Sequence, residues 1–173
     1  MVEFRRQARV HEAGRLCWRG AANEGGEGTV NAEELLAQVT LFRSLNKKQV
    51  TQLARFATVQ QYQPHQVIVR EGDTGLGLYV IVSGSVEVYK EPPAAEGPTV
   101  LRVLVAGDFF GEMALLDDYP RSATVRARDW TECLTLTKWH FLAELEQHPE
   151  MALPLLPVLS RRVRLAEERP EGR

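Results

Sequence analysis

The sequence has few of the residues that build covalent cross-links and metal centres. Its 173 residues include two cysteines, Cys17 and Cys133, and four histidines. The cysteines lie far apart in segments of different character, so they indicate neither a disulfide framework nor a metal-ligand spacing. Because Cys133 sits in an apolar strand pattern, we expect it in the core. The histidines form no His-x-His pair or acidic cluster of the kind that a catalytic metal requires, so we expect no metal site. They are His11, His65, His140 and His148.

Long hydrophobic runs and a strong net charge are also missing. The formal net charge is −2, and the hydrophobic fraction of 44% and charged fraction of 25% are typical of a globular protein. No apolar run approaches the roughly 20 residues of a membrane-spanning helix. The basic N-terminus lacks the apolar centre of a signal peptide. Such a charge does not favour non-specific binding to nucleic acids or membranes. We therefore expect one cytoplasmic domain with tails.

The first thirty residues carry the weakest structural signals. Val2 to Val10 contains three arginines and is compatible with a short helix, whose charged side chains we expect in solvent. Gly20 to Gly28 has the glycine-rich composition of a flexible linker. Residues 1–30 are therefore predicted to be a flexible N-terminal extension that precedes a single domain over residues 31–173.

Residues 31–57 are predicted to form two helices. Asn31 is a suitable N-cap, and Glu33 and Glu34 favour the positive end of a helix that runs to about Val39. Asn46 is a second N-cap, after which apolar residues recur at helical spacing up to residue 57. These two helices are expected to pack on a larger unit.

Residues 58–137 carry a pattern of short strands. Apolar residues alternate in Val67–Arg70, Val86–Tyr89 and Leu101–Val105, and a continuous apolar run spans Leu78–Val82. Residues 123–127 and 133–137 add the last two strands, and 91–98 is a proline-containing loop. Short strands without long helices between them predict an α+β, mainly β fold, an antiparallel β-roll resembling a jelly-roll barrel. Metal-binding cupins share this architecture, but this sequence lacks the cluster of metal-ligating residues that a cupin needs.

Residues 138–168 are predicted to be helical. A helix over residues 139–146 ends at His148-Pro149, and a second becomes regular near Pro157 because prolines interrupt its start. An apolar stripe along the second helix has two interpretations, a cover for the roll or the seam of a homodimer. Its members are Leu156, Leu159, Val163 and Ala166.

The stretch from Gly107 to Val125 reads as an anion-binding cassette. Gly111 permits backbone angles closed to other residues and a close approach of a ligand. Glu112 to Leu116 is a short helix-forming run whose N-terminus offers unpaired N–H groups. Arg121 has a permanently charged fork of donors that matches phosphate oxygens. Glu112 is suited to accept hydrogen bonds from a sugar hydroxyl. The pattern therefore predicts a sugar-phosphate ligand.

The segment F-G-E-M-A-L-L…P-R-S-A-T-V within this cassette resembles the phosphate-binding cassette of cyclic nucleotide-binding domains. The resemblance covers roughly residues 41–165. It implies a β-roll with N-terminal helices, a short cassette helix and C-terminal helices. It also implies that Glu112 holds the ribose 2′-hydroxyl, that Arg121 holds the cyclic phosphate and that Ser122 lies near the phosphate or base. The ligand-binding residues expected from it are Phe110, Gly111, Glu112, Met113, Ala114, Arg121, Ser122 and Ala123.

Three functions remain open from the sequence. The first is a stand-alone sensor of cAMP, or less favourably cGMP, that signals to a separate protein effector. The second C-terminal helix, as an apolar lid over the base, favours adenine, which it can cover without burying an unpaired polar atom. The Ser122 hydroxyl instead favours guanine, because it can accept a hydrogen bond from the guanine amine. The second is a structural or interaction domain that has lost its ligand. The third, a phosphodiester-cleaving enzyme, lacks a metal site and an activated nucleophile, so we expect no catalysis. No helix-turn-helix DNA reader is expected after residue 165.

Overall fold

The computed structural model describes residues 10–11, 15–19, 27–39, 42–43, 45–90, 99–117, 119–153 and 155–167. For residues 10–11, 15–19, 27–30, 114, 115, 155, 158, 162 and 165–167 only the backbone is described. Residues 2–9 of the short helix predicted near the N-terminus and the predicted loop over residues 91–98 lie outside these ranges, while Val10 belongs to a strand and not to a helix.

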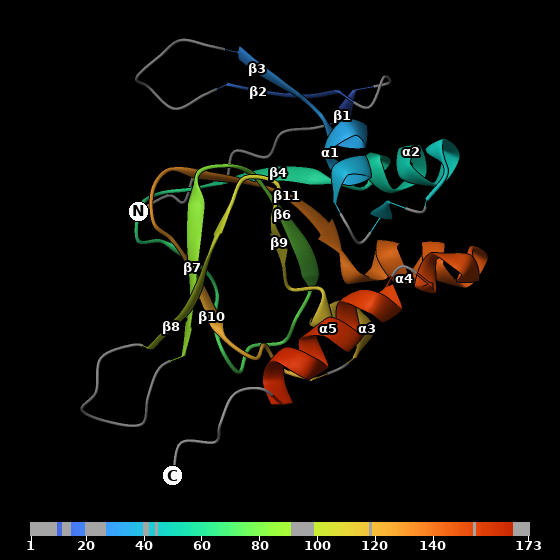
Figure 1. The fold of residues 1–173 in the computed structure, drawn as a ribbon. Coiled ribbons are helices and arrows are strands. Elements are labelled where there is room, and N and C mark those ends of the chain that lie inside the picture. The colour runs from blue at the N-terminus through green and yellow to red at the C-terminus, as the bar shows by residue number, and fades with distance from the viewer. Residues whose placement is uncertain are drawn as a thin grey trace.

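Two four-stranded antiparallel sheets face each other as a β-roll (Figure 1). One sheet has the strand order β5-β10-β7-β8 and the other β4-β11-β6-β9. This arrangement confirms the predicted α+β, mainly β fold. The strands are β4 (Thr58–Tyr62), β5 (Val67–Val69), β6 (Gly77–Ser83), β7 (Ser85–Lys90), β8 (Thr99–Val105), β9 (Phe109–Phe110), β10 (Thr124–Ala127) and β11 (Thr131–Thr137).

A third sheet precedes the roll and was not predicted from the sequence. It joins β1 (Val10–His11), β2 (Arg15–Arg19) and β3 (Glu27–Asn31) in antiparallel order. The strand β3 begins inside the glycine-rich segment that reads as a linker. Strands of two to five residues are too short to show a clear alternation, and their pairing partners lie across the intervening segment. Local composition therefore missed them.

The two N-terminal helices match the predicted ones. The helix α1 (Ala32–Gln38) begins at Asn31, whose side chain accepts hydrogen bonds from the backbone of Glu33 and Glu34. The helix α2 (Lys47–Arg55) begins at Asn46, which forms a reciprocal capping box with Gln49. Each cap pairs backbone N–H groups that the first turn of a helix leaves without a partner.

Three helical segments follow the roll. They are α4 (Lys138–Gln147), the 3₁₀ helix η2 (Pro149–Ala152) and α5 (Leu155–Glu167). The helix α5 begins two residues before Pro157, earlier than predicted. The proline lies in the first turn, where its missing N–H would have no partner in any case.

The core has two parts, one on each face of the β4-β11-β6-β9 sheet. Because both faces of β6 are covered, its apolar run is continuous rather than alternating. Between this sheet and the helices lie Ala32, Leu36, Val39, Phe42, Val50, Leu53, Ala54, Ala57, Val59, Leu78, Val80, Leu134, Leu136, Phe141 and Met151. Inside the roll lie Tyr62, Ile81, Val86, Val88, Leu104, Phe110, Val125, Ala127 and the predicted core residue Cys133.

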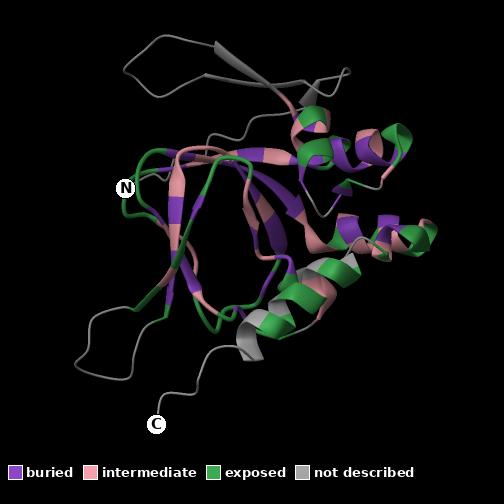
Figure 2. Cartoon of the chain, viewed as in Figure 1, coloured by how far each residue is buried: buried purple, intermediate pink, exposed green. Residues whose placement is uncertain are grey.

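The apolar stripe of α5 is largely turned to solvent (Figure 2). Leu156 is 59% exposed and Val163 is 57% exposed, while Leu159 is partly buried. In this structure the described part of the stripe therefore does not seal the roll. Among the described residues, no helix combines the length and hydrophobicity of a membrane span.

Candidate ligand-binding pocket

The predicted cassette connects β9 to β10 through the short helix α3 (Met113–Leu116). Glu112 is the residue immediately before α3, with a helical backbone conformation and no side-chain cap hydrogen bond. Its carboxylate is thus not engaged in capping its own helix. The side chain is 1% exposed, which is unusual for a carboxylate in a short surface connection.

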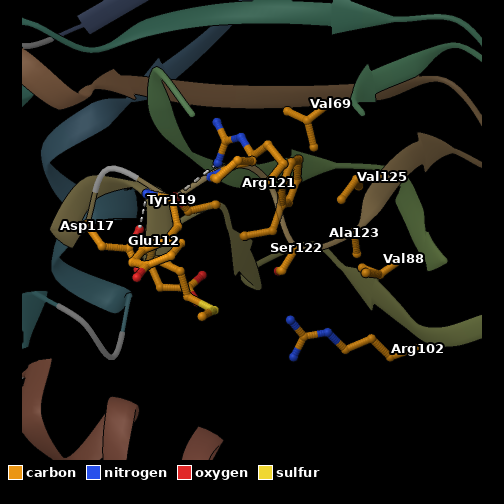
Figure 3. Close-up of a pocket in the computed structure, with 14 residues that line it drawn as sticks. Val69, Val88, Arg102, Glu112, Asp117, Tyr119, Arg121, Ser122, Ala123 and Val125 are labelled. Carbon is orange, nitrogen blue, oxygen red and sulfur yellow. Dashed lines mark hydrogen bonds between the residues drawn. The ribbon is translucent and has the colours of Figure 1, made fainter. Parts of the chain in front are cut away.

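A cavity of about 340 Å³ opens beside this cassette. Figure 3 shows Glu112, Asp117 and Tyr119 at one end, Arg121 and Ser122 near the middle, and Arg102 at the other end. All residues predicted for the site except Ala114 line this cavity, and the side chain of Ala114 lies outside the described residues. The lining set is Val69, Val88, Arg102, Phe110, Gly111, Glu112, Met113, Asp117, Tyr119, Pro120, Arg121, Ser122, Ala123 and Val125.

Arg121 is fixed in the cavity wall by two backbone carbonyls. Its Nη1 donates to the oxygen of Gly111 at 3.1 Å, and its Nη2 donates to the oxygen of Gly77 at 2.9 Å. The side chain is 7% exposed, and its buried Nε has no hydrogen-bond partner among the described residues. A buried donor without a partner costs free energy, which an anionic ligand at this position would recover.

Gly111 has the predicted unusual backbone angle and also a second task that the sequence did not suggest. Its φ angle is +85°, in the left-handed region that favours glycine. A Cβ at this position would lie 2.5 Å from Nη1 of Arg121 and 2.8 Å from the oxygen of Gly77. The missing side chain therefore makes room for the guanidinium of Arg121. Its effect on a ligand is indirect, because the ligand would contact the guanidinium that Gly111 admits.

Burial has the largest effect on the pKa of Arg121, and the net effect of its surroundings is to lower that pKa. Burial lowers the pKa of its guanidinium, while the neighbouring Tyr79 and the negative charge of Glu112 raise it. Arginine has so high an intrinsic pKa that it keeps its charge. The wall therefore presents a positive group beside a buried carboxylate, a combination suited to a ligand with a phosphate and a hydroxyl.

The far side of the cavity is a cross-strand row that the sequence did not reveal. Residues directly opposite one another on paired antiparallel strands have neighbouring side chains on one face of the sheet. The pairs Val69–Val125, Val125–Val88 and Val88–Arg102 follow one another across β5, β10, β7 and β8. The row is apolar until Arg102, which is exposed and directs its guanidinium toward the middle of the cavity (Figure 3).

Arg102 belongs to a strand whose inward face is hard to predict. Leu104 is buried, whereas Val103 is 43% exposed and Val105 is 53% exposed. Apolar residues thus occupy both faces of β8, and alternation alone cannot show which face is inside. Across the described ranges, His, Cys, Asp and Glu side chains form no group of three or more that could hold a metal ion.

Comparison with known proteins identifies the domain. The family described as the cyclic nucleotide-binding domain matches residues 59–148, which is more than half of the chain. The chain belongs to this family.

Relatives of this cyclic nucleotide-binding domain occur in larger proteins. The chain is 39% identical over 111 residues to a cAMP-dependent protein kinase regulatory subunit of Dictyostelium discoideum, covering 63% of this chain and 34% of the relative. It is 38% identical over 103 residues to a cGMP-dependent protein kinase of Toxoplasma gondii, covering 60% and 10%. The chain thus spans about a third of the length of the regulatory subunit and about a tenth of the length of the kinase.

A solved structure gives the same fold. The catabolite activator protein of Thermus thermophilus superposes with a TM-score of 0.67 and 33% sequence identity, covering 74% of this chain and 60% of that protein. The β-roll of this chain is thus similar to that of a bacterial activator, and its sequence is also similar to a kinase regulatory subunit and to a kinase.

We predict that Gly111→Ala destabilises the fold more than Gly107→Ala does. Both glycines have a positive φ, so each alanine should cost about 1–2 kcal/mol for its left-handed backbone. A Cβ at Gly107 meets nothing within 4 Å, whereas one at Gly111 meets Arg121. Urea unfolding of both variants measures the difference. Equal losses in free energy of unfolding would contradict the account of Gly111 as the residue that admits Arg121.

Proposed function

We propose that this chain is a regulatory sensor whose cavity binds a 3′,5′-cyclic nucleotide, with cAMP as its ligand. The observation that carries the proposal is the buried pair Arg121 and Glu112 in the wall of one cavity, within a domain of the cyclic nucleotide-binding family. The phosphate would bind the guanidinium of Arg121, and the ribose hydroxyl would donate to the carboxylate of Glu112. The row Val69, Val125 and Val88 would receive the apolar face of the base.

Loss of ligand binding is the main alternative, because a domain can keep this fold without a functional pocket. The buried Nε of Arg121 speaks for a ligand. A purely structural arginine at this position would be expected to have each buried donor paired. A phosphodiester-cleaving enzyme is not favoured by any observation, and the proposed role is binding without catalysis.

A route from the cavity to the C-terminal helices supports a signalling role. Asp117 lines the cavity, and its backbone oxygen accepts a hydrogen bond of 2.6 Å from Nζ of Lys138, the first residue of α4. Movement of the cassette on ligand binding would therefore reach α4 through this contact. We propose a separate protein effector in the cytoplasm, and the kinase-associated relatives make a protein kinase the first class of partner to test.

A homodimer through α5 is part of this proposal. The exposure of Leu156 and Val163 supports the seam interpretation of the apolar stripe over the cover interpretation. Sedimentation analysis of the chain and of Leu156→Asp tests it. A monomer at all concentrations, with and without cAMP, would remove the dimer from the proposal.

The second candidate ligand is cGMP, and Arg102 is the observation that favours it. The expectation of cAMP relied on an apolar lid from α5, but no described residue of α5 lines the cavity. Arg102 instead stands at the end of the apolar row. Its fork of donors matches the O6 and N7 acceptors of guanine, whereas adenine presents an amine at the first of these positions.

We expect saturating cAMP to stabilise the chain. At about 100 times its dissociation constant, a ligand that binds only the folded state adds roughly 2.7 kcal/mol to the free energy of unfolding. Thermal-shift and calorimetric titrations of ligand-stripped protein measure this, and Arg121→Ala, shown to be folded, serves as the non-binding control. No response to millimolar cAMP or cGMP would sink the proposal and leave the ligand-free domain as the interpretation.

Arg102→Ala is expected to separate the two bases. A bidentate arginine–guanine contact contributes about 1–3 kcal/mol to discrimination, so binding of cGMP should weaken by that amount while binding of cAMP changes little. Arg126→Ala is the matched control, because Arg126 lies on β10 of the same sheet but pairs with Glu87 and does not line the cavity. Equal weakening of both ligands by Arg102→Ala would exclude Arg102 as a base-reading residue.

A further inference from the structure

Tyr79 lies behind Arg121 and is not among the residues that line the cavity. It sits on β6, where it pairs directly with Phe110 of β9. The two rings stack with centroids 4.9 Å apart and planes 6° from parallel. Directly paired residues project to the same side of their sheet, so the strand register itself brings the rings together. The stack therefore depends on backbone pairing rather than on a flexible loop.

Arg121 rests against the face of this stack. Its Cζ lies 5.8 Å from the centroid of the Tyr79 ring, within the range of a cation–π interaction. The electron-rich face of an aromatic ring attracts a cation, and the attraction grows when the cation is removed from water. Since Arg121 is 7% exposed, the contact with Tyr79 operates in a largely dry environment.

The two strands hold Arg121 in the same way. From β6, the carbonyl of Gly77 accepts from Nη2, and the ring of Tyr79 lies beneath the guanidinium. From the end of β9, the ring of Phe110 supports Tyr79, and the carbonyl of Gly111 accepts from Nη1. Each strand thus contributes one carbonyl and one ring, which together restrict both the plane and the rotation of the guanidinium.

Tyr79 acts in this arrangement as a neutral ring. Burial raises the pKa of its phenol above the ordinary value, so the hydroxyl keeps its proton at neutral pH. The contact with Arg121 is consequently made by the ring face and not by a phenolate. A phenylalanine should preserve it, whereas an aliphatic side chain of similar size should not.

From this geometry we infer that Tyr79 is a positioning residue: its ring, stacked on Phe110, holds the Arg121 guanidinium in the orientation that receives the ligand phosphate. The inference rests on the proposed function, because it assigns a role within the same site. Tyr79 is not among the residues that line the cavity, so its role would be exerted through Arg121.

The first experiment needs no ligand. In ¹⁵N-labelled protein, the Nε–H signal of Arg121, assigned by its loss in Arg121→Lys, should be shifted by the ring current of Tyr79. Tyr79→Phe should retain that shift, and Tyr79→Leu should lose it. Tyr89→Leu is the matched control, because Tyr89 makes a similar contact with Arg126, at 5.2 Å, outside the cavity lining. It should leave the Arg121 signal unchanged.

The second experiment measures binding of cAMP to the same variants. Tyr79→Leu should weaken binding roughly 3-fold to 30-fold, the range of a cation–π contact, while Tyr79→Phe and Tyr89→Leu should change it less than 2-fold. If Tyr79→Leu does not fold, Tyr79→Met replaces it, since methionine fills a similar volume without a ring.

The results separate this inference from the proposed function. An Arg121 signal that does not respond to loss of the Tyr79 ring overturns the inference, whatever the binding data show. Equal weakening of cAMP binding by Tyr79→Phe and Tyr79→Leu also overturns it, because the hydroxyl would then be the active group. A responding signal without any binding of cAMP or cGMP to the parent chain supports the positioning of Arg121 and refutes the proposed function alone.

Discussion

The buried positive charge of Arg121 is the interaction on which the cavity depends. Removing an ion from water costs several kcal/mol unless surrounding groups replace the lost hydration. Here the replacements are the carbonyls of Gly77 and Gly111, the face of Tyr79 and the nearby charge of Glu112. The Nε group remains without a partner among the described residues. The structure thus holds a cation that is oriented but incompletely paired.

The architecture around this arginine follows from strand pairing and two glycines. A Cβ on Gly77 would lie 2.7 Å from the oxygen of Leu136 on the neighbouring strand β11, and one on Gly111 would meet Arg121 itself. Side chains at either position would separate the strands or expel the guanidinium. The opposite sheet supplies the apolar row that ends at Arg102. The cassette therefore places the charged side chains of Glu112 and Arg121 on one side of the cavity, and β8 places that of Arg102 on the other.

The cassette and most of the roll could be predicted because their signals are local. Glu112 and Arg121 belong to one continuous stretch of sequence. The continuous apolar run of β6 is typical of a strand that is covered on both faces. Arg102 could not be assigned, since it reaches the cavity through a register that shifts between Val88 and Tyr89 and through a strand that is apolar on both faces. The β1–β3 sheet was missed because short strands beside a glycine-rich segment carry almost no periodicity. The position of Tyr79 behind Arg121 likewise needs the register of β6 and β9.

The most direct test of the account compares cAMP with adenosine in the parent chain and in Arg121→Ala. The two ligands share the base but differ in the phosphate, so their difference in binding free energy isolates the charge that Arg121 is held to receive. The account predicts that the parent chain prefers cAMP and that Arg121→Ala loses about 2–5 kcal/mol of that preference, with binding of adenosine little changed. An undiminished preference for cAMP in a folded Arg121→Ala variant would contradict it.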